Sequence, residues 1–381
     1  MKSEKNIDYR RKTCKFLYVH FALTAFFTPP DIQQMEFVMD YPRPIRTDID
    51  WSALSFGYMP TRSHIAFHWK DGAWDKGELK TDPFISMSIA ATCLHYGQAC
   101  FEGMKAFRCK DGKVRVFRPW ENIARMNRTG HQLLHPEIPE EMYLEAIHRV
   151  VLDNIDYVPP YGSGGSMYIR PLFIGTGPQI GVSPAAEYDF LIMVMPVGAY
   201  YKDGLKGVPA LVIEDFDRAA PKGMGQFKVA GNYGASLMPA KLAKKAGFPI
   251  PLFLDPREHK YIDEFGTSNF LAITKDGKYV TSDSPSILPS VTNMSLMQVA
   301  RDLGITVEKR PIVAEEELPT FAEVDACGTA VVITPISSVT IHGKVIEYGH
   351  ECGPVSQKLY DHLTGIQKGE LEDTHNWLYT I

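Results

Sequence analysis

A glycine-rich segment with a single lysine places the tightest limit on how this chain folds. Residues 223–235 read GMGQFKVAGNYGA, so that Lys228 lies among small residues and four glycines. Glycine adopts positive φ angles and lets the backbone approach another molecule closely. A helical pattern over residues 235–245 follows and ends at Gly247. Such a loop suits a lysine that acts as an amine catalyst in a cleft, but alone it fits a surface turn with a solvated lysine equally well.

Length and composition narrow the class of protein. With 381 residues the chain is long enough for two domains with sizeable cores. Its net charge of -5 and the lack of a long basic run argue against a nucleic-acid-binding protein. The six cysteines form no Cys-x-x-Cys pair and the twelve histidines lack ligand spacing, so we expect no metal site and reduced thiols in the cytoplasm.

The first residues differ from the rest. Basic residues precede a short apolar run over residues 16–27, as in a signal peptide, but no small-x-small cleavage site follows. The run is too short to span a bilayer, so no membrane partner is expected. We predict an N-terminal extension over residues 1–49, either disordered or translated from an upstream start with Met35 as the true beginning. Export through a targeting segment is the alternative.

Periodicity divides the remaining chain into two α/β domains. Residues 50–197 predict a small α+β domain with helices on a mostly antiparallel sheet, including a hairpin over residues 105–117 and strands over 166–174 and 188–197. Residues 198–208 are rich in glycine and polar groups and are predicted to link the domains. Residues 209–381 predict a larger domain in which residues 261–274 form an extended apolar segment.

Polar groups inside that apolar segment point to chemistry. Glu264 lies in a run that otherwise predicts a buried strand. Burial of a carboxylate is costly unless a cation or hydrogen-bond donors meet it. We therefore expect Glu264 to have a cationic partner. A purely structural ion pair is the simpler interpretation.

Two further segments suit an anion. Residues 285–291 lead into a helix, and residues 326–330 place Gly328 and Thr329 in a turn before a strand. A helix N-terminus and a glycine-threonine turn both offer N–H groups to phosphate. With Lys228 and Glu264 they meet the needs of pyridoxal phosphate: an amine, a carboxylate at the pyridine nitrogen, a hydroxyl at the phenolic oxygen and a phosphate cradle.

Six sequence motifs, taken in their order along the chain, resemble those of a known enzyme family. They are KVAGNYG (228–234), EFGTSNF (264–270), SILPSV (286–291), LHYGQACFEGMKAF (94–107), FRPW (117–120) and YIRP (168–171). From about residue 50 onward, the chain resembles the branched-chain amino acid aminotransferases of class IV. The resemblance implies fold type IV, the D-amino-acid aminotransferase-like fold, with the cofactor at the interface of the two domains. It departs from the animal enzymes at Val331 and Thr334, where those carry a Cys-x-x-Cys.

The resemblance also implies residue roles toward the cofactor, pyridoxal 5'-phosphate. Lys228 is the catalytic residue: it forms the Schiff base and moves a proton between the substrate Cα and the cofactor C4′, which requires an uncharged amine. Tyr233 faces the phenolic oxygen and Glu264 the pyridine nitrogen. The remaining cofactor-binding residues are Arg125, Thr267, the Ile287 backbone N–H and the Thr329 hydroxyl.

The substrate pocket follows from the same resemblance. Its predicted members are Phe56, Phe101, Tyr168, Arg170, Tyr200, Thr267 and Ala330, with Tyr96 and Val182 reaching over from the partner of a homodimer. Aromatic walls suit the side chains of L-leucine, L-isoleucine and L-valine. Arg170 and the tyrosine hydroxyls are the expected partners of the second carboxylate of L-glutamate and 2-oxoglutarate. Phe56 and Phe101 also fit simple core residues, and Arg170 fits a structural ion pair.

We therefore predict reversible amino transfer between branched-chain L-amino acids and 2-oxoglutarate. Two alternatives keep the cofactor: a D-amino-acid aminotransferase and an aminodeoxychorismate lyase. A third is a non-catalytic protein that binds the cofactor.

Overall fold

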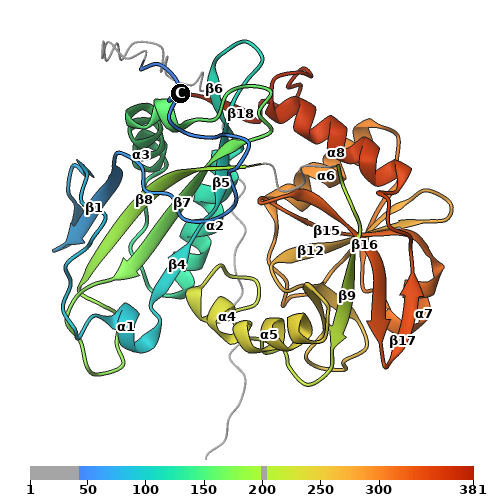
Figure 1. The fold of residues 1–381 in the computed structure, drawn as a ribbon. Helices are drawn as coiled ribbons and strands as arrows, with labels where there is room; N and C mark the ends of the chain where they lie inside the picture. The colour runs from blue at the N-terminus through green and yellow to red at the C-terminus, as the bar shows by residue number, and fades with distance from the viewer. Residues whose placement is uncertain (1–42, 199–203) are drawn as a thin grey trace, which may run out of the picture. The chain divides into compact units, whose positions relative to one another are not determined.

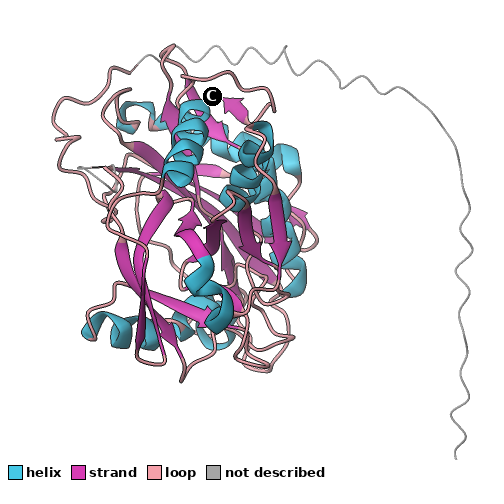
Figure 2. Ribbon diagram, turned by 90° about the vertical axis from the view of Figure 1, so that its right-hand side faces the viewer, coloured by secondary structure: helices cyan, strands magenta, loops and turns pink. Residues whose placement is uncertain are grey.

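The computed structural model describes residues 43–198 and 204–381 (Figure 1). The predicted N-terminal extension therefore lies outside the described residues as far as residue 42, as do residues 199–203 of the predicted linker. Residues 43–381 form one compact unit. Both helices and strands contribute throughout, as Figure 2 shows. No helix in residues 43–198 or 204–381 is long and apolar enough to cross a membrane.

The first sheet is built from strands before residue 198 and from the end of the chain. Its order is β18-β6-β5-β7-β8-β1-β2, with β3 beside β1 and β4 beside β7. The strands are β1 (His64–Lys70), β2 (Ala73–Trp74), β3 (Glu78–Lys80), β4 (Ala99–Phe101), β5 (Met104–Arg108), β6 (Val114–Phe117), β7 (Ser166–Gly175), β8 (Glu187–Val197) and β18 (Leu378–Thr380). All pairings between these strands are antiparallel, and the predicted β5–β6 hairpin is confirmed.

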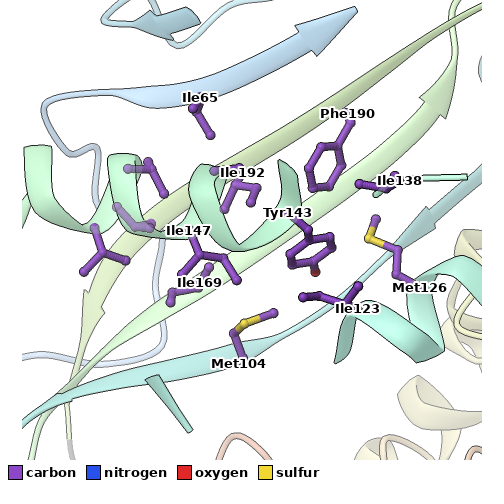
Figure 3. Packing of buried hydrophobic residues seen from close by; sticks show 14 of the residues in the cluster. Ile65, Met104, Ile123, Met126, Ile138, Tyr143, Ile147, Ile169, Phe190 and Ile192 are labelled. Atoms are coloured by element: carbon purple, nitrogen blue, oxygen red, sulfur yellow. The ribbon is translucent and has the colours of Figure 1, made fainter. Parts of the chain in front are cut away.

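Two amphipathic helices cover one face of this sheet. Helix α2 (Pro119–Gln132) begins with a proline, whose fixed φ suits a first helical position, and α3 (Glu140–Asp153) follows it. Their apolar stripes, with Ile123 and Met126 on α2 and Tyr143 and Ile147 on α3, pack on Ile169 and neighbouring strand residues (Figure 3). Full burial of such side chains is worth about 1.5–3 kcal/mol each, so this core holds the antiparallel sheet in place.

The second sheet is mixed and has the order β11-β10-β9-β16-β15-β12-β13-β14, with β17 beside β16. Strand β9 runs parallel to β10 and β16, and β13 runs parallel to β14. The strands are β9 (Val208–Ile213), β10 (Ile250–Leu254), β11 (Ile262–Phe265), β12 (Ser268–Thr274), β13 (Tyr279–Ser282), β14 (Val307–Arg310), β15 (Phe321–Gly328), β16 (Val332–Ile341) and β17 (Lys344–Glu347).

The other helices border this sheet or connect strands. Helices α6 (Val291–Asp302) and α8 (Pro354–Gln367) share a buried apolar cluster with its strands and lie beside β15 and β16 in Figure 1. The shorter helices are α1 (Thr92–Tyr96), α4 (Ala230–Ala235), α5 (Leu237–Lys245) and α7 (Ala314–Glu317), with 3-10 turns at Ile155–Tyr157 and Leu318–Thr320.

Two sequence-based element predictions differ from the structure. The helix predicted over residues 235–245 begins earlier, as α4, which ends at Ala235, and continues as α5. The extended segment over residues 261–274 is two antiparallel strands, β11 and β12, with Gly266 and Thr267 in the turn between them. Apolar periodicity does not register a two-residue turn inside a buried run, whereas a glycine there allows it.

Candidate active site

Lys228 is held against the first sheet by its own backbone. Its N–H donates to the Thr129 hydroxyl on α2 over 3.2 Å, and its carbonyl accepts from the Phe101 N–H on β4, also over 3.2 Å. The side-chain amine donates to the Tyr233 hydroxyl over 3.0 Å. Tyr233 lies one helical turn along, on α4, so the start of this helix brings the hydroxyl to the amine. The predicted lysine and tyrosine are therefore in direct contact.

Aromatic rings and an arginine surround that amine. The Lys228 amine lies 4.9 Å from the centroid of the Phe101 ring, and Phe101 packs edge-on against Tyr233 at 4.7 Å. The Arg170 guanidinium lies 4.8 Å from the centroid of the same ring and donates to the Tyr168 hydroxyl over 3.0 Å. Phe56 packs on Tyr168 at 4.9 Å between ring centroids. Thus four predicted pocket residues form one continuous wall that begins at the lysine.

A glycine makes room for this wall. A Cβ atom on Gly103 would lie 2.2 Å from the Tyr168 hydroxyl oxygen, closer than real contacts allow. Only glycine permits the tyrosine to occupy its position there.

Glu264 on β11 is 4% exposed and lies among donors. One carboxylate oxygen is 2.9 Å from the Arg218 guanidinium and accepts from the Leu288 N–H over 3.2 Å. The other accepts from the Asn269 amide over 2.5 Å. Burial raises the pKa of the Glu264 carboxyl, and the Arg218 charge and these donors oppose that effect only in part. The expected cationic partner is present.

Arg218 is a site residue that sequence reasoning did not find. Besides its ion pair with Glu264, it donates to the carbonyl oxygens of Gly225, over 2.8 Å, and Ser286. It thereby ties the lysine loop to the strand that carries Glu264 and to the loop before α6. Gly225 is required here, because a Cβ atom would lie 2.0 Å from the Ser286 oxygen. The buried carboxylate signalled a cation, but nothing in the loop around Arg218 indicated which one.

Arg125 on α2 is engaged by a second carboxylate that sequence reasoning also missed. Its guanidinium makes a bidentate ion pair with Glu102, with both N–O distances 2.7 Å, and donates to the Pro289 carbonyl over 2.8 Å. Asn122 completes the shell of Glu102 over 2.8 Å. Burial would raise the pKa of the Glu102 carboxyl, but the Arg125 charge, with lesser contributions from Lys228 and Asn122, keeps it below its ordinary value. An acidic residue inside the apolar run that begins at Ala99 was the available signal.

A narrow cavity adjoins this pair at the start of α6. Val291 and Thr292 of α6, Thr329 of the turn after β15, and Asn122 and Lys105 from the first-sheet region line it. The Ser290 hydroxyl caps α6 by accepting from Asn293, whereas the first N–H groups of a helix have no acceptor within it. Ile287 does not line this cavity; the neighbouring Leu288 N–H is directed at Glu264 instead.

The remaining predicted site residues lie at the surface or in turns. Thr267 is exposed at the β11–β12 turn, and its carbonyl oxygen lies 3.9 Å from the Cβ position built on Gly328. Ala330 is exposed, and its carbonyl accepts from the Lys105 amine over 2.7 Å. Tyr96 and Val182 are exposed away from this cluster of contacts, although the Tyr96 hydroxyl donates to the Ile180 carbonyl. Tyr200 lies outside the described residues.

Comparisons with known proteins show the family of this chain. The family model for amino-transferase class IV matches residues 99–339, and the chain belongs to this family. It is 46% identical over 343 residues to a branched-chain-amino-acid aminotransferase of Haemophilus influenzae, covering 88% of this chain and 99% of that protein. A protein of the same name from Helicobacter pylori is 44% identical over 337 residues, covering 88% and 98%.

A solved structure shows the same fold. The branched-chain amino acid aminotransferase of Escherichia coli superposes with a TM-score of 0.68 at 29% identity, covering 82% of this chain and 98% of that chain. The predicted fold type IV, with mixed α and β structure, is confirmed.

Proposed function

We propose that this protein is a branched-chain amino acid aminotransferase that uses pyridoxal 5'-phosphate. It transfers the amino group reversibly between L-leucine, L-isoleucine or L-valine and 2-oxoglutarate. One observation carries the assignment: the Lys228 amine lies 3.0 Å from the Tyr233 hydroxyl and faces the Phe101 ring, in a loop that Arg218 ties to the buried Glu264. When bound, the cofactor supplies a carbonyl for the amino group and a ring that accepts electrons from the substrate Cα.

The residues present fit that cofactor. Lys228 is the amine that binds it and then moves a proton at the substrate Cα, while Tyr233 donates to its phenolic oxygen. Glu264 stands at the pyridine nitrogen, where a carboxylate keeps that nitrogen protonated. Leu288 donates to one carboxylate oxygen of Glu264 and Asn269 to the other, and together they hold the carboxylate in one orientation.

The phosphate end has two sources of donors. Arg125 uses three of its N–H groups on Glu102 and Pro289, and the others remain for phosphate oxygens. Thr329 and the first two residues of α6, Val291 and Thr292, line the adjoining cavity, and in this proposal the Thr329 hydroxyl and the two N–H groups donate to the phosphate. We assign the helical part of the cradle to these two residues, with Ile287 as the sequence-based alternative.

The aromatic wall accounts for the substrates. Phe56, Phe101 and Tyr168 offer apolar surface to a branched aliphatic side chain. Arg170 is held by rings and by the Tyr168 hydroxyl and has no carboxylate partner among the described residues. It therefore provides a positive charge for the second carboxylate of L-glutamate. Tyr200 and Thr267 are assigned to this pocket on resemblance alone.

A homodimer completes the site in this proposal. Large apolar side chains are exposed together on the segments around α1 and residue 180, namely Phe84, Ile85, Ile89, Leu94, Tyr96, Ile180 and Val182. The Tyr96 hydroxyl donates to the Ile180 carbonyl, so two of these segments lie together, and exposed apolar side chains that gather in one place mark an interaction site. Val182 is 87% exposed, so a second copy would cover it and would bring Tyr96 and Val182 to the neighbouring pocket. A cytoplasmic location also belongs to this proposal and is supported by the free cysteines.

The dimer is tested by Val182→Glu with Val345→Glu as the control. Val345 is also an exposed valine, 57% exposed, but lies on β17 of the second sheet. We expect Val182→Glu to shift the sedimentation coefficient from dimer to monomer and to lower activity, and Val345→Glu to do neither. A dimer that is unchanged by Val182→Glu would contradict the assignment of this face.

The function is tested with Lys228→Ala and a substrate panel. Purified protein loaded with pyridoxal phosphate should convert L-leucine, L-isoleucine and L-valine with 2-oxoglutarate. Lys228→Ala should lose this turnover and the absorbance near the visible edge, whereas Lys222→Ala, an exposed lysine in the same loop, should keep both. Turnover retained by Lys228→Ala would refute the assignment. Activity only with D-alanine, or pyruvate released from aminodeoxychorismate, would identify one of the other class-IV enzymes.

A further inference from the structure

Lys105 joins the two sheets at the turn that carries Thr329 and Ala330. It projects from β5 of the first sheet, where it pairs in register with Tyr168. Its amine donates to the Ala330 carbonyl over 2.7 Å. Ala330 lies in the turn that connects β15 and β16 of the second sheet. Gly328 and Val332, the last paired residues of these two strands, flank this turn. A single lysine side chain therefore spans from the aromatic wall to this turn.

The turn does not hold its own shape strongly. Its internal backbone hydrogen bond, from the Val331 N–H to the Gly328 carbonyl, is long at 3.3 Å. Val332, which follows at once, has a φ of +72°, a region that β-branched residues rarely adopt. Such strain persists only where surrounding contacts fix the backbone. The contact from Lys105 is a charged one and so is stronger than a neutral hydrogen bond.

The charge of Lys105 is not used elsewhere. Within residues 43–198 and 204–381 its amine forms no ion pair with a carboxylate, and it lines the cavity that also contains Thr329. Burial lowers the pKa of the Lys105 ammonium to about 8, which shows that its desolvation is not offset by a carboxylate. Lys105 is half-buried, and among the described residues its amine donates to the Ala330 carbonyl.

We propose that Lys105 is a positioning residue for the amino-acid substrate, because its amine holds the Ala330 carbonyl and so fixes the 328–332 turn that carries both Thr329 and Ala330. This inference rests on the proposed function and on the resemblance, which assigns Ala330 to the substrate pocket. Lys105 acts through the turn and does not itself take part in proton transfer. Its removal should thus weaken the binding of amino acid and oxo acid far more than that of the cofactor, because Arg125 and the first N–H groups of α6 hold the phosphate besides Thr329.

The test compares Lys105→Met, which keeps the apolar stem and removes the donor, with Lys105→Arg, which keeps a charged donor. Lys105→Gln is a second neutral variant in case the methionine variant does not fold. Lys110→Met, at the exposed β5–β6 turn, is the control. The measurements are KM and kcat for L-leucine and 2-oxoglutarate, the Kd of the apo-protein for pyridoxal phosphate from absorbance, and amide hydrogen exchange over residues 328–332.

We expect the neutral variants to lose about ten- to a hundredfold in kcat/KM, mostly through KM, as for a misplaced substrate. Hydrogen exchange of the turn should rise in the apo-protein, the cofactor Kd should stay within about twofold of the wild type, and Lys105→Arg should restore much of the loss. A weakened cofactor Kd with unchanged KM would overturn the proposal and make Lys105 a phosphate ligand. Unchanged KM and unchanged exchange would overturn it as well. Wild-type activity toward L-leucine, measured beside the variants, tests the proposed function separately.

Discussion

Two buried arginine–carboxylate pairs lie at this site, and they differ in how completely each carboxylate is neutralised. Glu102 and Arg125 form a bidentate pair with both distances 2.7 Å, and Asn122 adds a further donor. Glu264 and Arg218 share one contact of 2.9 Å, and Arg218 divides the same nitrogen between two backbone carbonyls. Accordingly the pKa of the Glu102 carboxyl lies below its ordinary value and that of Glu264 lies above it.

This difference in neutralisation distinguishes a structural ion pair, Glu102–Arg125, from a carboxylate that a cationic ligand would stabilise, Glu264. A carboxylate that is fully paired has nothing to gain from another cation. Glu264 is buried and incompletely compensated, so a protonated ring nitrogen beside it would relieve that cost. Strongly perturbed carboxyl groups in a site are for this reason candidates for function. We therefore treat Glu102–Arg125 as the scaffold of the phosphate end and Glu264 as the group that acts on the cofactor.

The largest effect should come from Glu102→Gln. The change leaves Arg125 buried without its counter-charge, which typically costs about 3–5 kcal/mol. We expect the free energy of unfolding, measured with urea on the apo-protein, to fall by that amount. Glu121→Gln is the control, because Glu121 forms a partly exposed pair with Arg118 and should cost less than about 1 kcal/mol. If both variants lost the same free energy of unfolding, Glu102–Arg125 would not be a buried structural ion pair of the kind inferred above.

Glu264→Gln should act on catalysis as well as on stability. A neutral amide cannot keep the pyridine nitrogen protonated, so turnover should fall by about 10²–10³-fold, the range seen when one group directed at developing charge is removed. The glutamine keeps one oxygen for Arg218 and Leu288, but Arg218 loses its counter-charge and the new amide meets the Asn269 amide, so stability should fall as well. Cofactor binding, measured by its absorbance, checks that the site is still folded. If kcat for L-leucine were reduced less than about threefold, Glu264 would be a second scaffold pair and the comparison would fail.

The sequence predicted one of these pairs in outline and missed the other. Glu264 stood out because a carboxylate within an apolar strand needs a cation, and the cation is present. Its identity, Arg218, was not predictable, since that arginine lies in an irregular loop and is brought in by tertiary contacts to Gly225 and Ser286. Arg125 was singled out through its motif, but the bidentate contact with Glu102 joins a strand residue to a helix residue that no periodicity relates.

The fold followed from periodicity more closely than the site did. The β5–β6 hairpin and the long strands β7 and β8 lie where apolar patterns placed them, because each pattern reports on one element packing against a core. The narrow cavity at the start of α6 depends instead on segments far apart in the sequence that meet there, among them β5, α2, α6 and the β15–β16 turn. The sequence indicated that the helix start after residue 285 suits a phosphate group. Which backbone N–H groups point toward that phosphate depends on the backbone orientation, so the prediction of Ile287 could not be made from the sequence pattern alone.

A third buried carboxylate extends the comparison, because it has no cationic partner among the described residues. Asp325 on β15 is 1% exposed and accepts from the Ser356 hydroxyl over 2.6 Å, with Glu323 on the same strand. Burial, opposed by Ser356, raises the pKa of the Asp325 carboxyl to about 8 from an ordinary value of 3.8. In the folded protein this group therefore keeps its proton at pH values where the unfolded chain has lost it.

The sign of the pH effect follows directly. Between about pH 4 and pH 8 folding takes up a proton at Asp325, so stability falls as pH rises across this window and levels off above it. Asp325→Asn removes this contribution, and we expect the variant to gain on the order of 1–3 kcal/mol over the wild type at pH 8 and to gain little at pH 4. Urea unfolding at both pH values measures the difference, in which other titrating groups cancel. If the difference in unfolding free energy between variant and wild type were the same at both pH values, Asp325 would be ionised in the folded protein. Asp325 and Glu264 would then not differ in protonation, although only Glu264 has a cationic partner.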